Sequence, residues 1–225
     1  MEEARAYEEL RVGFTAAVSH ELRTPLARLL ALLESASLPD ADTEPLLAQA
    51  REQVEEMSEL VDDVLFLSEL ESGREVVALG STAALPVLEN VRDRLADSAE
   101  RADVTIRIAA DAGVELPLRR RMLQIIAENL VENSIRYAGP GSTLTLSAGN
   151  GVLTAADDGR GVEEDELPRL FERFYRSDRA RASRGTGLGL AIVKHVVTAA
   201  GGEVEATGGP GHGLTVTCSF MSAPG

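Results

Sequence analysis

Ser19-His20-Glu21-Leu22-Arg23-Thr24-Pro25 places an imidazole, a carboxylate and a hydroxyl within a long apolar stripe. The apolar residues recur at intervals of three and four, which predicts a helix with one buried face. They are Leu10, Phe14, Val18, Leu22, Leu26, Leu29 and Leu33. At about 100° per residue, His20 lies roughly 200° from Val18 and Leu22, so we expect it to point toward water. The heptapeptide therefore predicts proton-assisted chemistry at an exposed histidine.

Two neighbours of His20 support this interpretation. Thr24 follows one turn later and is expected on the same helix face. Glu21 is adjacent to His20 and three residues before Thr24, close enough to orient or deprotonate a reacting group. Pro25 has no N–H and crowds the carbonyl of Glu21, so we expect the helix to bend there. His20 alone would be read as an exposed residue of an amphipathic helix, and only the whole heptapeptide favours a reactive site.

The heptapeptide resembles the H-box of the sensor histidine kinases. The resemblance implies that His20 is the phosphoacceptor and that Glu21 is the base or orienting acid. Glu21 to Thr24 also fits the E-x-x-T pattern of this family, which implies that Thr24 positions water for dephosphorylation of a partner.

Composition limits the remaining possibilities. The chain has 225 residues, enough for one large domain or two modest ones, and 44% hydrophobic content is enough for cores. With 37 acidic against 22 basic residues, the net charge of −15 argues against binding of a nucleic-acid backbone. The single cysteine, Cys218, excludes a disulfide within the chain, and strict alternation from Leu214 to Phe220 predicts it to face inward from a strand.

No apolar run approaches the ~20 residues that a membrane-spanning helix needs, and no signal-peptide pattern is found at the N-terminus. We therefore expect a soluble, cytoplasmic polypeptide. Any membrane attachment would come from a sensor segment that this chain lacks.

A second helix follows the first. Leu38-Pro39-Asp40-Ala41-Asp42 predicts a turn, with Asp42 or Thr43 as the helix cap. A heptad-like seam then runs to about Leu70 and consists of Leu47, Ala50, Val54, Met57, Val61 and Val64. Two such helices form an antiparallel hairpin that cannot cover both apolar faces, so we expect two copies to pair into a dimeric four-helix bundle. Packing against the rest of a monomer is the alternative.

The period changes after Glu71-Ser72-Gly73-Arg74, the predicted linker. We therefore expect one domain over residues 1–72 and a second over 73–225. In the second, helices are predicted at 85–99, 119–137 and 188–200, and strands at 104–108, 143–147, 152–156, 203–206 and 214–220. Helices on one face of a mixed sheet make a two-layer α/β sandwich. The fold class is therefore α+β: a helical hairpin followed by a sandwich.

One side of the helix at 119–137 is polar. It carries Glu128, Asn129, Asn133, Arg136 and Tyr137 at spacings of three and four, while apolar residues face the core. Amide and carboxylate oxygens are suitable ligands for Mg²⁺ beside phosphates. A solvated helix face is the alternative, which fits poorly because asparagine is unfavourable inside helices.

This pattern resembles the N-box of the histidine kinases. The resemblance implies Asn133 as a metal ligand with Glu128 and Asn129 in support, and places Arg136 and Tyr137 beside the nucleotide. The family often has lysine where this chain has Arg136, but the positive charge is retained.

Asp157-Asp158-Gly159-Arg160-Gly161 follows a predicted strand. A carboxylate can accept a hydrogen bond from the exocyclic amine of adenine, and glycines allow close approach of the backbone. The pattern resembles the G1 box, which implies that Asp157 reads adenine beside Gly159 and Gly161. Asp158 stands where asparagine is common and would add negative charge beside the phosphates. By itself, D-x-G-x-G also fits a turn that ends a strand.

Gly185-Thr186-Gly187-Leu188-Gly189-Leu190 opens a helix, so its backbone N–H groups can cradle phosphate. It fits neither the Walker A nor the G-x-G-x-x-G pattern. It resembles the G2 box, which implies nucleotide contacts from Gly185, Thr186, Gly187, Leu188 and Gly189. Phe171 and Phe174 resemble the F-box, which tethers a lid over ATP. Together these motifs imply the GHKL fold that type II topoisomerases and heat-shock ATPases share.

The resemblance covers nearly the whole chain, with its boxes in order. It implies a homodimeric protein histidine kinase that binds ATP and Mg²⁺, phosphorylates His20, passes the phosphoryl group to an aspartate of a response regulator, and also dephosphorylates that regulator. An ATP-gated binding module is the alternative, disfavoured by His20 beside Glu21. A structural dimerisation domain is disfavoured by the intact Asn133 and Asp157. A protein that acts mainly as a phosphatase stays open.

Overall fold

The computed structural model describes residues 2–39, 41–71, 80–177 and 185–220. The chain separates into two compact units, Met1–Phe66 and Leu67–Gly225. The predicted domain boundary between residues 72 and 73 lies outside the described residues.

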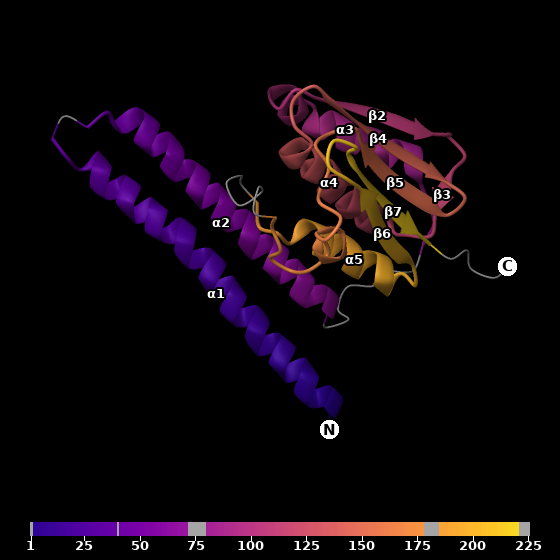
Figure 1. The fold of residues 1–225 in the computed structure, drawn as a ribbon, viewed down its shortest axis with the longest axis horizontal. Helices are drawn as coiled ribbons and strands as arrows, with labels where there is room; N and C mark the ends of the chain where they lie inside the picture. Colours follow the sequence, from indigo (N-terminus) through magenta and orange to yellow (C-terminus); the bar gives the residue numbers. More distant parts are fainter. Residues whose placement is uncertain (1, 40, 72–79, 178–184, 221–225) are drawn as a thin grey trace. The chain divides into compact units, whose positions relative to one another are not determined.

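The first unit is a helical hairpin, as predicted. Helix α1 (Glu2–Ala36) and helix α2 (Thr43–Glu71) run antiparallel (Figure 1). Pro25 lies inside α1 and is buried. Seven large apolar side chains of the two helices are 43–59% exposed: Leu26, Leu30, Leu33, Leu47, Val54, Val61 and Leu65. The hairpin therefore leaves much of its apolar surface uncovered. No described helix is both long and apolar enough to cross a bilayer.

The second unit is built on a five-stranded sheet with the order β2-β4-β5-β7-β6. Strand β2 (Val104–Ala110) pairs parallel with β4 (Ser142–Gly149), and α4 (Arg120–Tyr137) lies between them in sequence. All other pairs are antiparallel and involve β5 (Val152–Asp157), β6 (Glu203–Gly208) and β7 (Leu214–Ser219). The sheet is mixed, as predicted.

Three helices cover one face of this sheet (Figure 1): α3 (Ala84–Arg101), α4 and α5 (Gly189–Ala199). Burial alternates along the strands, so that Leu144, Leu146, Leu153 and Val216 lie in the core at 2% exposure or less. Cys218 continues this pattern in β7, and burial raises the pKa of its thiol to about 12. The prediction that it faces inward is confirmed, and a thiol with this pKa is inert at neutral pH.

Three short elements were not predicted. Strands β1 (Thr82–Ala83) and β3 (Glu115–Leu116) form a small antiparallel pair, and η1 (Leu167–Arg169) is a single 3-10 turn. Elements of two or three residues are too short to carry a hydrophobic period. The longer predicted elements all occur.

Candidate active site

The H-box residues lie on α1 as the sequence predicts. His20 and Thr24 are exposed, and Glu21 is half-buried. A shallow surface depression is lined by His20, Arg23, Thr24, Ala27, Arg28 and Ala31. His20 and Thr24 therefore share one face, together with two guanidinium groups. Positive charge beside an exposed imidazole favours approach of an anionic phosphate.

Asn129 is fixed between α4 and α5. Its amide Nδ2 donates a hydrogen bond to the carbonyl of Ile125 at 2.8 Å. The amide oxygen points at the start of α5, where a Cβ built on Gly189 would lie 2.6 Å from Oδ1. Any side chain at position 189 would therefore collide with Asn129.

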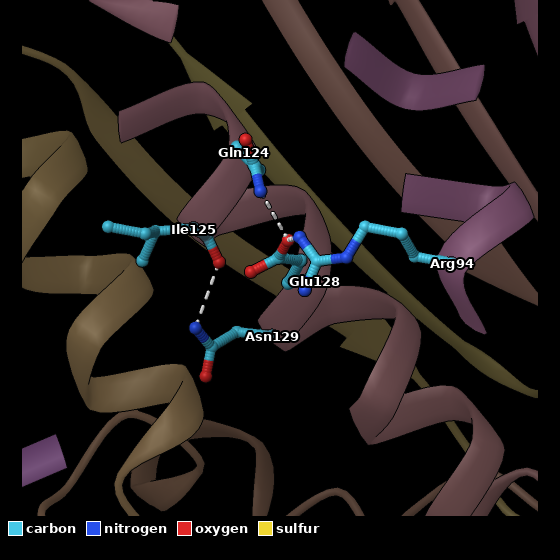
Figure 2. Close-up of polar contacts among 5 residues, drawn as sticks. All are labelled: Arg94, Gln124, Ile125, Glu128 and Asn129. Atoms are coloured by element: carbon cyan, nitrogen blue, oxygen red, sulfur yellow. Dashed lines mark hydrogen bonds and ion pairs between the residues drawn. The ribbon is translucent and has the colours of Figure 1, made fainter. Parts of the chain in front are cut away.

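Glu128 points away from Asn129, toward α3 (Figure 2). Its Oε1 is paired with Arg94 and accepts a hydrogen bond from Nε2 of Gln124 at 2.8 Å. This pairing does not support Glu128 as a metal ligand. Among the described residues, no cluster of three or more His, Cys, Asp or Glu side chains could hold a metal ion. Asn133, half-buried one turn after Asn129, is the remaining candidate from α4.

The end of α4 approaches the glycine-rich segment. A Cβ built on Gly185 would lie 3.0 Å from the Tyr137 hydroxyl and 3.1 Å from Nη1 of Arg136. Arg136 also pairs with Glu132 at 3.8 Å. The structure thus brings Arg136 and Tyr137 to Gly185, and its missing side chain leaves a cradle there.

Asp157 ends β5 with its carboxylate held by two backbone amides. Oδ1 accepts hydrogen bonds from Gly159 N–H at 2.9 Å and from Leu214 N–H at 3.3 Å. Burial raises the pKa of Asp157 although both amides act to lower it. The partly buried carboxylate is an acceptor of fixed orientation, as recognition of a base requires.

The G1 glycines lie close to other parts of the backbone. A Cβ on Gly159 would lie 2.5 Å from Cα of Ala138. Gly161 has φ +64°, and a Cβ there would collide with the carbonyl of Gly209. Both glycines therefore permit close packing of protein backbone, and their contact with a nucleotide stays a prediction. Asp158 accepts a hydrogen bond from Thr143 N–H at 2.6 Å, which fixes the start of β4.

The G2 segment leads into α5. Thr186 is buried, and its Oγ1 accepts a hydrogen bond from Leu188 N–H at 3.2 Å. Leu188 is fully buried, so its side chain is part of the core. Gly187 has φ +70°, and its carbonyl accepts a hydrogen bond from Phe174 N–H at 2.9 Å. The F-box is thereby tied to the G2 segment. Most of the lid expected between them lies outside the described residues, which end at 177 and resume at 185.

Two site residues escaped the sequence analysis. Leu214 contributes only its backbone amide to Asp157, so no side-chain pattern could reveal it. Arg94 holds Glu128 from 34 residues away. A charged residue on an amphipathic helix gives no signal for such a long-range pair.

A carboxylate at the end of a strand, paired asparagines on the adjacent helix and a glycine-rich helix start define a nucleotide-binding domain of the GHKL class. Comparisons with known proteins agree. Residues 118–224 match the family of histidine kinase-, DNA gyrase B- and HSP90-like ATPases, and residues 10–73 match the His Kinase A (phospho-acceptor) domain.

Relatives carry both parts in one chain. The sensor-like histidine kinase SenX3 of Mycolicibacterium smegmatis is 34% identical over 96% of this chain and 59% of its own length. The phosphate regulon sensor protein PhoR of Pseudomonas aeruginosa is 38% identical over 96% of this chain and 51% of its own length. The structure of Acinetobacter baumannii histidine kinase AdeS has a TM-score of 0.73 at 26% identity, covering 91% of this chain and 98% of that one.

The chain therefore belongs to the sensor histidine kinases of two-component systems and has the organisation of their catalytic core. It spans about half the length of these curated relatives.

Proposed function

We propose that this chain is an ATP-dependent protein histidine kinase that phosphorylates His20 and passes the phosphoryl group to an aspartate of a response regulator. One observation carries the proposal. A single chain combines an exposed His20, followed by Glu21, with a carboxylate held by backbone amides, Asp157, and a glycine-rich segment that leads into α5.

Each group has a defined task in this proposal. Asp157 accepts the exocyclic amine of adenine, and the first N–H groups of α5 and the Arg136 guanidinium face the phosphates. Nε2 of His20 attacks the γ-phosphorus while the bond to the β,γ-bridging oxygen breaks and ADP leaves. Glu21 accepts a hydrogen bond from Nδ1–H of the imidazole, which fixes the tautomer and orientation of the ring, and takes that proton as the N–P bond forms.

Asn133 would hold Mg²⁺ together with phosphate oxygens and water. Mg²⁺ commonly takes only one or two protein ligands at phosphate sites, so a single amide oxygen fits the donor set on α4. When bound, the ion neutralises charge on the β- and γ-phosphates.

The partners follow from the hairpin. Its exposed leucine and valine stripes are suited to a second copy of the chain, which would complete a four-helix bundle. The depression around His20 and Thr24, with Arg23 and Arg28, would receive the acidic phosphorylation site of a response regulator. Because ATP is a cytoplasmic substrate, we place this core in the cytoplasm.

Incubation with γ-labelled ATP tests the kinase. Wild type is expected to gain acid-labile, base-stable label, the signature of a phosphoramidate. His20→Gln should bind ADP as wild type does but take up no label. Label retained on His20→Gln would show that the acceptor is another residue, and no label on either protein despite ADP binding would favour the binding module.

A further inference from the structure

Ser134 carries a buried hydroxyl to which no described residue is hydrogen-bonded. It directly follows Asn133 on α4 and is 2% exposed. Within the described part of the chain, its Oγ has no hydrogen-bond partner. A serine inside a helix commonly donates to the carbonyl one turn earlier. Leaving a buried hydroxyl unpaired costs about 1–3 kcal/mol, so the position calls for a partner that binds there.

The packing of α4 shows where this hydroxyl lies. Leu130, Val131 and Ser134 continue the buried stripe of α4 that meets the sheet. Ala138 follows Ser134 by one turn on the same face. Its carbonyl accepts a hydrogen bond from Arg160 N–H at 2.9 Å, and its Cα would touch a Cβ on Gly159. Ser134 is therefore on the side of α4 that adjoins the loop after Asp157.

Asp157 reaches the same space from the sheet. Leu153 and Ala155 of β5 are buried under the helices, and Asp157 is the next residue on that face. Both backbone amides that hold its carboxylate bond to Oδ1. Oδ2 has no hydrogen-bond partner among the described residues. The strand alternation places Asp157 on the helix side of the sheet, and the contacts of Ala138 with Gly159 and Arg160 place this end of α4 beside the end of β5.

We propose that Ser134 determines base specificity together with Asp157: its hydroxyl donates a hydrogen bond, directly or through one water, to the purine ring nitrogen beside the exocyclic amine that Asp157 accepts. This inference rests on the proposed function. Adenine presents a donor, its amine, flanked by the acceptor nitrogens N1 and N7. Guanine presents an acceptor at the same exocyclic position, which would meet the Asp157 carboxylate unfavourably. An acceptor paired with a donor therefore matches adenine.

Calorimetric titration of the full chain with ADP, 1-deaza-ADP and 7-deaza-ADP tests this assignment. Ser134→Ala is expected to bind ADP about threefold to tenfold more weakly, the effect of one neutral hydrogen bond. One deaza analogue should bind wild type more weakly than ADP does. Ser134→Ala should bind that analogue and ADP equally, because the hydroxyl no longer distinguishes them. The ligand-free variant should unfold at the same temperature as wild type or higher, since no internal bond is lost.

Ser142→Ala is the matched control. Ser142 is also buried, but its Oγ donates to the Gly139 carbonyl at 2.6 Å. This variant should lose stability yet keep the wild-type preference among the three nucleotides. Ser134→Cys keeps the size of the side chain with a weaker donor and should lie between wild type and Ser134→Ala.

Two results would overturn the inference: wild-type ADP affinity in Ser134→Ala, or an undiminished penalty for both deaza analogues in that variant. If ADP affinity falls in Asp157→Asn but not in Ser134→Ala, only the Ser134 assignment fails. If the wild-type chain binds no ADP, both the proposed function and the Ser134 assignment fail.

Discussion

At the scale of single residues, Asp157 shows how a site can oppose stability. Burial raises its pKa above the ordinary value of 3.8, so the folded chain holds this proton more tightly than the unfolded chain. The stability that protonation provides is present at low pH and is lost as the pH rises through the raised pKa. At neutral pH the ionised carboxylate therefore destabilises the ligand-free fold.

Asp157→Asn should accordingly separate binding from stability. The asparagine oxygen can still accept from Gly159 and Leu214, but the buried charge is gone. We expect a higher unfolding temperature than wild type at pH 7 without ligand, with a difference that shrinks toward pH 4. ADP affinity should fall by about 1–3 kcal/mol, because a charge-assisted acceptor is lost. Thermal unfolding and calorimetry measure the two effects.

Asp158→Asn is the control for this pair. Asp158 is exposed and bonds only to Thr143 among the contacts described above. It removes a negative charge near the expected phosphates, so it should leave ADP affinity unchanged or raise it, but not lower it. Equal ADP affinity in wild type and Asp157→Asn would refute the adenine role of Asp157.

Thr24 offers a separate test on the hairpin. Its hydroxyl shares the depression with His20 and can hold a water beside the phosphorylated aspartate of a docked regulator, a task that autophosphorylation does not need. Thr24→Ala should keep labelling at His20 but slow the loss of phosphate from the regulator. Time courses with the regulator decide this. Identical decay would remove the phosphatase role, and parallel loss of both activities would indicate an effect on the helix around Pro25 instead.

At the scale of elements, the contact between α4 and α5 depends on one missing Cβ. Gly189→Ala should lower the free energy of unfolding by about 1–3 kcal/mol, because the methyl group would meet Asn129 Oδ1. Alanine is otherwise the better helix former, so the sign of the change reports the collision. Chemical denaturation measures it.

A double variant checks the cause of this loss. Adding Asn129→Ala to Gly189→Ala should restore much of the lost stability, because the collision is removed. It should not improve nucleotide binding, because Asn129 is lost. Gly113→Ala is the control glycine, since a Cβ there meets nothing within 4 Å. A Gly189→Ala protein as stable as wild type would mean that Asn129 moves aside freely.

Contacts between elements are the features that the sequence could not predict. Periodicity located α1, α2 and α4 because each carries several turns of apolar repeat, and the motifs located Asp157 and Gly185. The pairing of Glu128 with Arg94 and the packing of Gly161 on Gly209 depend on segments that meet only in the fold. Sequence spacing predicted that Glu128 and Asn129 share one polar side of α4. In the fold, Glu128 instead points toward Arg94 of α3. Local periodicity cannot contain that information.

At the scale of the whole molecule, the exposed stripe of the hairpin predicts assembly. Leu30 is 59% exposed on α1. Leu30→Lys should convert a dimer into a monomer in sedimentation velocity, since burying an unpaired charge in a bundle core is strongly unfavourable. ADP binding by the second unit should persist. Leu38→Lys is the control, because Leu38 is 63% exposed in the turn between the helices. A monomeric wild type would contradict the proposal.

The place of β7 in the sheet has a consequence for how the protein is made. β7 lies between β5 and β6, and its first residue, Leu214, supplies an amide to Asp157 from 57 residues further along the chain. At roughly 5–20 residues per second, a ribosome needs several seconds to add that stretch. Until then β5 has an unpaired edge, which invites association with other nascent chains. The Asp157 carboxylate also lacks one of its two backbone anchors. Under the proposed function, a newly synthesised chain completes its nucleotide site only when β7 joins the sheet, so that ATP would bind finished domains in preference to partly made ones.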